Sequence, residues 1–218
     1  MYQDSIRDPE KFWSQYGQML DWTKRPSAVL KQSTKKLASG VSHPTWSWFP
    51  DGELNTCYNC VDRNVLKGHG HYPAIHWDSP VDGQKETISY AKLLEEIEVL
   101  AGVLKEAGLK KGDNVVVYMP MIPQALIGLL AIARLGASHA VVFGGFSSAS
   151  LAQRIEASQP RLILTASCGI EGAKGPTSYQ PLVRGAIEKS SWKPERTLIW
   201  QRKKRRWDPI KSELGDLT

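Results

Sequence analysis

The stretch Asn114–Met119, with the sequence NVVVYM, decides the fold class, because its β-branched residues predict a buried strand. Pro120–Leu135 (PMIPQALIGLLAIARL) follows it and predicts an apolar helix. Two further strands are predicted at Ser138–Phe143 (SHAVVF) and Arg161–Ala166 (RLILTA). Strands that alternate with helices at this spacing indicate an α/β protein whose parallel sheet is covered on both faces.

A pair of glycines, Gly144-Gly145, separates the second of these strands from the next helix. Ser147 is a natural N-cap for that helix, which we expect at Ser148–Ser158. Open α/β sheets bind ligands beyond the carboxyl ends of their strands, so the turn is a candidate binding site. Two interpretations are open: the glycines let a ligand approach the backbone, or they only make a tight turn. The spacing differs from the G-x-G-x-x-G of a dinucleotide site.

The regular pattern starts earlier, at about residue 74. Ala74–Trp77 and Glu86–Ser89 predict a hairpin around Asp82-Gly83. Tyr90–Ala107 predicts an amphipathic helix with Ser89 as its N-cap.

The two ends of the chain differ from this regular part. Met1–Arg63 is rich in Trp, Pro and turn residues, and within it we expect a helix at Glu10–Leu20. Such a segment is expected to wrap over a larger body rather than fold alone. Near the other end, Thr197–Trp200 predicts a last strand that the rest of a larger sheet would follow. An edge left exposed there would favour association.

Composition excludes several classes of protein. Hydrophobic residues make up 41% of the 218 residues, which is enough for a packed core, and no run of about 18 apolar residues indicates a membrane span. Three cysteines do not make a disulfide framework. The start, Met1-Tyr-Gln-Asp-Ser, lacks the apolar segment of a secretory signal. These features favour the cytoplasm, with mitochondria left open.

The net charge of +6 is unevenly distributed, because Arg202–Arg206 (RKKRR) holds five consecutive positive charges. One interpretation is a nucleic-acid patch or a nuclear address, and the other is a solvated hairpin or loop. No aromatic or helix-turn-helix pattern supports nucleic-acid binding, so we expect no nucleic-acid partner.

Two cysteines have the spacing C-x-x-C, at Cys57 and Cys60, with His69 and His71 downstream. A zinc site and a redox pair are both conceivable, but the spacing is not a common zinc pattern and no second C-x-x-C exists. We therefore expect no metal site.

Two single residues have structural interpretations. Arg134, at the end of the apolar helix, is expected to cap that helix or to form an ion pair. His139 lies in a strand that we expect to be buried, where it would need only a hydrogen-bond partner.

Several motifs together resemble the acyl-CoA synthetase family of adenylate-forming enzymes, and most of all its short-chain acetyl- and propionyl-CoA synthetases. The matching segments, in the family's order, are Phe12-Trp13, Trp48–Asn55 (WFPDGELN), Tyr58–Arg63 (YNCVDR), Arg134–Ala137 (RLGA) and Val141–Ser147 (VVFGGFS). Ser167–Glu171 (SCGIE) looks more like the propionyl type than the acetyl type.

The resemblance implies an α/β fold: an N-terminal extension at residues 1–65 and part of a parallel AMP-binding domain at residues 66–218. It covers only the first third of such an enzyme, so we expect a truncated or split form. The parent reaction joins a short-chain carboxylate to CoA through an acyl adenylate, with ATP and Mg²⁺. The family's phosphate-binding loop, which ends in Pro-Lys-Gly, and its catalytic lysine are not found in this sequence. We therefore assign no catalytic residue and expect ligase ancestry without activity of the chain alone.

The resemblance also implies a site for the nucleotide end of CoA. Phe143, Gly144 and Gly145 match the family's glycine turn. A second contact matches the loop Glu171-Gly172-Ala173-Lys174, where Lys174 would meet a CoA phosphate. Glu171 departs from the basic residue of the acetyl type, and its carboxylate repels phosphate. The alternative to a synthetase fragment is a module that binds CoA or a partner without catalysis.

Overall fold

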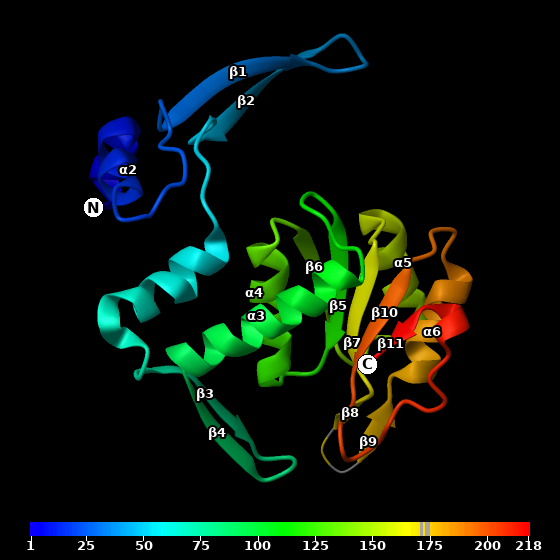
Figure 1. Ribbon diagram of the computed structural model, residues 1–218. Helices are drawn as coiled ribbons and strands as arrows, with labels where there is room; N and C mark the ends of the chain where they lie inside the picture. The colour runs from blue at the N-terminus through cyan, green and yellow to red at the C-terminus, as the bar shows by residue number, and fades with distance from the viewer. Residues whose placement is uncertain (171, 173–174) are drawn as a thin grey trace. The chain divides into compact units, whose positions relative to one another are not determined.

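A computed structural model describes all residues of the chain except Glu171, Ala173 and Lys174 (Figure 1). The chain divides into two compact units, Met1–Asn59 and Cys60–Thr218. Each unit is described by itself. Within the described residues, no helix combines the length and the apolar character needed to cross a bilayer.

The N-terminal unit contains two short helices and a hairpin. The helices are α1 (Tyr2–Arg7) and α2 (Pro9–Gly17), and the antiparallel strands are β1 (Leu30–Lys36) and β2 (Ser42–Trp48). Helix α2 confirms the predicted helix, with Asp8 as its N-cap, but ends three residues early. The hairpin was not predicted. The rings of six aromatic residues are in contact with one another: Phe12, Trp13, Tyr16, Trp22, Trp48 and Phe49. The cluster is only partly buried, because Trp13, Tyr16 and Trp48 are 39%, 37% and 49% exposed.

The second unit begins with π-helical turns and a hairpin. The turns are η1 (Tyr58–Asp62) and η2 (Val65–His69). Strands β3 (Pro73–Ser79) and β4 (Gln84–Ser89) pair antiparallel, and helix α3 (Tyr90–Glu106) follows directly. The predicted hairpin and helix are therefore confirmed, and the Ser89 hydroxyl accepts the expected capping bond from the Lys92 N–H at 3.3 Å.

A five-stranded sheet forms the centre of this unit, in the order β11-β10-β7-β5-β6 with all neighbours parallel. The strands are β5 (Asn114–Met119), β6 (Ser138–Phe143), β7 (Leu162–Ala166), β10 (Arg196–Trp200) and β11 (Asp216–Leu217). The four predicted strands are confirmed within one residue. The prediction that Thr197–Trp200 is the last strand is wrong, because β11 pairs with it through Thr197 and Leu198.

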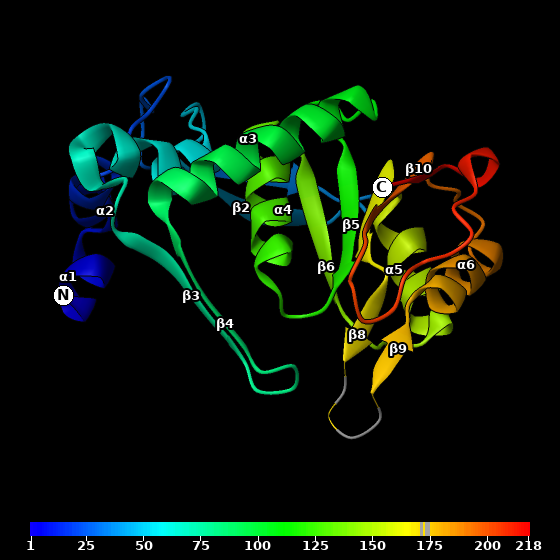
Figure 2. The ribbon, with the colours of Figure 1, turned by 60° about the horizontal axis from the view of Figure 1, so that its bottom comes forward.

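Helices cover both faces of the sheet, as expected for crossover connections between parallel strands (Figure 2). The two views place α5 (Ser148–Ser158) and α6 (Gln180–Lys189) on one face, and α3 and α4 (Pro123–Arg134) on the other. Helix α4 starts three residues later than predicted, because Pro123 occupies its first turn. Helix α6 was not predicted, and neither was the small hairpin of β8 (Cys168–Ile170) and β9 (Pro176–Ser178).

Strand β6 lies at one edge of the sheet and is only partly covered. His139 is exposed there, so the prediction that it is buried is wrong. An edge strand has a partner on one side only, and β6 leaves Val141 and Phe143 more than half exposed. Association was predicted for the other side of the sheet, at Thr197–Trp200, and stays a prediction.

Candidate functional site

A pocket of about 300 Å³ lies beyond the carboxyl ends of β5 and β6, where open α/β sheets bind ligands. One wall comes from the β3–β4 hairpin and the opposite wall from the ends of the sheet strands and β8. The lining residues are Trp77, Asp78, Ser79, Pro80, Val81, Pro120, Met121, Ile122, Phe143, Gly144, Ile170, Tyr179 and Arg202. Two of the residues predicted for CoA binding, Phe143 and Gly144, are among them.

Gly144 is required by close packing beneath the pocket. A Cβ atom at this position would lie 2.9 Å from the Met119 carbonyl oxygen and would also collide with the Tyr179 hydroxyl. Gly169 on β8 has the same neighbour, so the buried Tyr179 side chain sits between two glycines. The floor of the pocket therefore needs a residue without a side chain at Gly144.

Gly145 is required by its backbone conformation, with φ of +97°. Its N–H donates to the Tyr118 hydroxyl at 3.1 Å, and that hydroxyl donates to the Phe146 carbonyl at 2.8 Å. The Gly145 N–H is therefore already engaged within the protein. Both glycines thus have structural roles, and a ligand here would meet the surface of the turn and the Phe143 ring, which is 64% exposed.

The second predicted contact lies in the loop between β8 and β9. Glu171, Ala173 and Lys174 lie outside the described residues. Gly172 is described and has a positive φ of 49°, with open space where a Cβ would be. Ile170, the last residue of β8, lines the pocket.

The hairpin wall of the pocket was not foreseen from the sequence. The Trp77 indole N–H donates to the Met121 carbonyl at 3.1 Å, which ties β3 to the end of β5. Arg202 pairs with Asp82 at the hairpin tip at 3.2 Å. These contacts join residues 44 and 120 positions apart, so no local pattern in the sequence could reveal them.

Within the basic run Arg202–Arg206, one side chain lines the pocket and the other four residues are exposed to solvent. Arg202 lines the pocket, and an isolated bridge between Arg202 and Arg205 closes a tight turn. Lys203, Lys204 and Arg206 are exposed, and Trp207 immediately after them is buried. The run is a tight turn with a solvated tip and one inward-pointing arginine.

The two cysteines of the C-x-x-C lie in different surroundings, since Cys57 is buried and Cys60 is exposed. Within the described part of the chain, no three His, Cys, Asp or Glu side chains gather closely enough to hold a metal ion.

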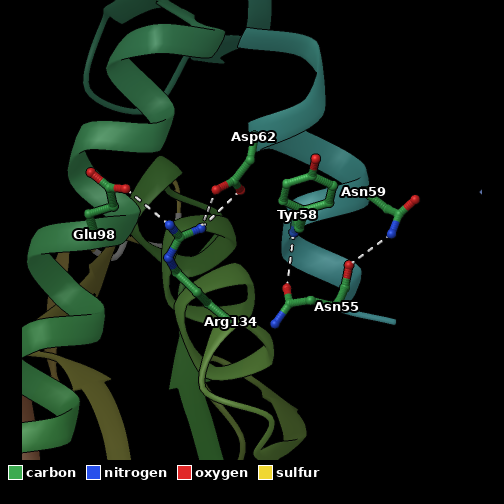
Figure 3. A network of polar contacts seen from close by, with 6 residues as sticks. All are labelled: Asn55, Tyr58, Asn59, Asp62, Glu98 and Arg134. Atoms are coloured by element: carbon green, nitrogen blue, oxygen red, sulfur yellow. Dashed lines mark hydrogen bonds and ion pairs between the residues drawn. The ribbon is translucent and has the colours of Figure 1, made fainter. Parts of the chain in front are cut away.

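Arg134 forms an ion-pair network, which confirms one of the two roles expected of it (Figure 3). It donates two hydrogen bonds to the Asp62 carboxylate, at 2.7 and 2.9 Å, and a third to Glu98 at 3.0 Å. The network joins the end of α4 to α3 and to η1. It lies away from the pocket, so its role is to hold elements together.

The described residues define an α/β protein with a parallel sheet and a pocket at the carboxyl ends of its strands. Residues 62–215 match the family model described as AMP-binding enzyme, and residues 1–60 match the model described as acetyl-coenzyme A synthetase N-terminus. The chain belongs to the AMP-binding enzyme family.

Similar proteins agree with this assignment. "Acyl-CoA synthetase short-chain family member 3, mitochondrial" from Bos taurus is 46% identical over 198 residues, which are 91% of this chain and 28% of that protein. An acetyl-coenzyme A synthetase from Streptomyces coelicolor is 41% identical over 87% of this chain and 28% of its own length. The chain therefore spans about 28% of the length of these relatives.

A solved structure shows the same fold. The acetoacetyl-CoA synthetase from Streptomyces lividans superposes with a TM-score of 0.78 over 99% of this chain and 31% of that chain. The sequence identity is 20%, so this likeness establishes the fold alone.

Proposed function

We propose that these 218 residues are the N-terminal portion of a short-chain acyl-CoA synthetase, and that they supply part of its CoA site. One observation carries the proposal: a pocket lined by Phe143 and Gly144 lies at the carboxyl edge of a sheet in a chain that matches two successive synthetase-related family models. In the proposed parent reaction, ATP activates a short-chain carboxylate, and CoA then receives the acyl group. We keep propionate as the preferred acid, with acetate as the alternative.

The chemistry proposed for this chain is binding. The exposed Phe143 ring offers a flat apolar surface to the adenine of CoA, as aromatic side chains do for nucleic-acid bases. Lys174 would supply a positive charge for a CoA phosphate, while Glu171 would oppose it. When bound, CoA supplies the thiol that accepts the acyl group. The side chains named here only hold and orient its nucleotide end.

We further propose that these residues alone do not catalyse the reaction. The sequence contains neither the phosphate-binding loop nor the catalytic lysine that the resemblance calls for. A pyrophosphate-exchange assay with acetate or propionate tests this directly. Exchange by the purified chain would contradict the proposed inactivity.

Titration calorimetry with CoA tests the site. We expect weak binding that Phe143→Ala and Lys174→Ala each reduce about tenfold, which corresponds to about 1.4 kcal/mol. Val99→Ala is the matched control, because Val99 is similarly exposed but faces away from the pocket on α3. Absence of CoA binding by the folded, unaltered chain would remove the proposed site.

The alternative is a module that binds CoA or a partner without catalysis. In one outcome, the chain binds CoA but gains no ligase activity when the remainder of a short-chain synthetase is supplied. That outcome would favour this alternative.

We propose a cytoplasmic location. Mitochondria are the alternative, because the name of the bovine relative includes the word mitochondrial.

A further inference from the structure

The tip of the β3–β4 hairpin is attached to the carboxyl edge of the sheet by an ion pair between Asp82 and Arg202, 3.2 Å apart. Both ribbon views show this tip beside the β8–β9 hairpin (Figures 1 and 2). Residues Pro80 and Val81, next to Asp82, line the pocket together with Arg202. The ion pair therefore joins two walls of the same pocket.

The pair is unusually well shielded from solvent for this protein. The Arg202 and Asp82 side chains are 11% and 2% exposed, whereas the Lys85–Asp78 pair on the same hairpin is 78% and 58% exposed. Shielding makes an ion pair less sensitive to salt, and loss of one partner then leaves a buried charge without compensation.

Arg202 is itself fixed in place by the segment that leads from β7 into β8. Its guanidinium donates to the Cys168 carbonyl at 3.2 Å, and its backbone N–H donates to the Ser167 hydroxyl at 2.8 Å. Asp82 is held less completely, because its Oδ1 atom makes no hydrogen bond among the described residues. An incompletely satisfied buried pair contributes little to stability, so positioning of the hairpin is the better explanation for it.

We propose that Arg202 and Asp82 form a clasp that fixes the β3–β4 hairpin as one wall of the pocket, and that both are positioning residues for the ligand bound there. The identity of that ligand as CoA rests on the proposed function. The clasp itself does not. It also gives the first arginine of the basic run a role inside the protein, separate from the solvated tip at Lys203 and Lys204.

Hydrogen–deuterium exchange measures the clasp without any ligand. Asp82→Asn keeps the shape of the side chain and removes its charge, and we expect it to speed exchange of the amides at 79–84 about tenfold by local opening. Amides of β5, in the centre of the sheet, should keep their rates. Arg202→Ala should do the same, and Arg202→Lys should restore part of the protection.

Two variants control for charge. Lys85→Ala breaks the exposed ion pair of the same hairpin, and Lys203→Ala removes a charge next to Arg202 that points into solvent. Neither should change exchange at the hairpin tip by more than about twofold. If Arg202→Ala fails to fold by circular dichroism, Asp82→Asn decides. Unchanged exchange at 79–84 in a folded Asp82→Asn variant would overturn the clasp.

CoA calorimetry on the same variants separates the clasp from the proposed function. If the unaltered chain binds CoA, Asp82→Asn should weaken binding about fivefold, while Lys203→Ala leaves it unchanged. If Asp82→Asn speeds amide exchange at the hairpin tip but does not weaken CoA binding, the positioning role is overturned and the ion pair is only a structural contact. Absence of CoA binding by the unaltered chain would end the proposed function, and the exchange result alone would then decide the clasp.

Discussion

The two faces of the sheet are covered to different extents, although both are built from apolar strands. Under α5 and α6 the face is closed, with a cluster of buried side chains that includes Leu151, Ile155, Val183 and Trp207. On the other face, α3 and α4 leave a groove of about 450 Å³ over β7 and β10. Trp200 and Val99 line this groove and are 49% and 66% exposed.

Apolar strands therefore do not guarantee that helices bury both faces of a sheet equally. Helices α5 and α6 pack against each other, and the buried Trp207 side chain packs with them in the same cluster. The centre of the Trp207 ring lies 5.6 Å from the Arg184 guanidinium. Helix α3 instead packs on α4 and follows directly from the β3–β4 hairpin, so α3 and β10 line the groove together without closing it. Four predictions test this contrast.

The largest effect is expected on the closed face. Leu151→Ala should lower the free energy of unfolding by about 2–5 kcal/mol, because Leu151 is fully buried and its truncation leaves a cavity that neighbours fill only in part. Urea denaturation followed by circular dichroism measures this. Leu126→Ala on α4, where the side chain is 42% exposed, is the matched control and should cost less than about 1 kcal/mol. Equal losses would show that the two faces are packed alike.

The next effect concerns the helix layer beside the groove. Arg134→Ala should cost about 1–3 kcal/mol, because it leaves the Asp62 carboxylate, 14% exposed, without the two hydrogen bonds that Arg134 Nη1 donates to it. Asp62→Asn in the same background should add little, since the two residues act together. Full additivity in this double-mutant cycle would contradict the network as the source of the effect.

A smaller, pH-dependent effect is expected at the end of α5. Four hydrogen bonds, from the hydroxyls of Ser190 and Ser191 and the backbone of Ser191 and Trp192, hold the pKa of the Glu156 carboxyl at about 2 instead of 4.5. Because the folded pKa is depressed, this contribution is present above pH 4.5 and is lost as the pH falls through about 2. Glu156→Gln should therefore flatten the fall in melting temperature across that window. An unchanged acid limb would mean that these bonds do not stabilise the folded carboxylate.

The smallest effect is expected in the groove. Val99→Ser should change the free energy of unfolding by less than about 0.5 kcal/mol, because the side chain is already 66% exposed. Thermal melting measures this alongside Leu151→Ala. A loss above about 1 kcal/mol would show that the groove is filled in solution, and a change in sedimentation would identify self-association as the cause.

Much of the fold was predictable because its signals are local. The strands Asn114–Met119 and Ser138–Phe143 were predicted at the residues observed, and Ser89 and Ser147 cap the predicted helices. Helix α6 was missed, because Pro181 and Gly185 weaken the helical pattern that its buried face, Val183 and Ala186, would otherwise give.

The candidate site was predictable only in part. The glycine turn predicted the end of the sheet where the pocket lies, because that end follows from the order of strand, turn and helix. The need for Gly144 came from Tyr179, which lies 35 positions later, and the hairpin wall came from Trp77 and Arg202. Packing between distant segments has no local sequence pattern, so these residues could not be named in advance.

Local sequence patterns alone predict the class of the sheet, the direction of its strands and the end of the sheet at which the pocket lies. These follow from β-branched runs, helical periodicity and caps, which act over a few residues. Only the folded chain shows which face of the sheet is closed and which arginine of the basic run points into the protein. It also shows that β11 extends the sheet beyond β10. These features depend on burial and on ion pairs between residues up to 120 positions apart, and such contacts form only when the chain is folded.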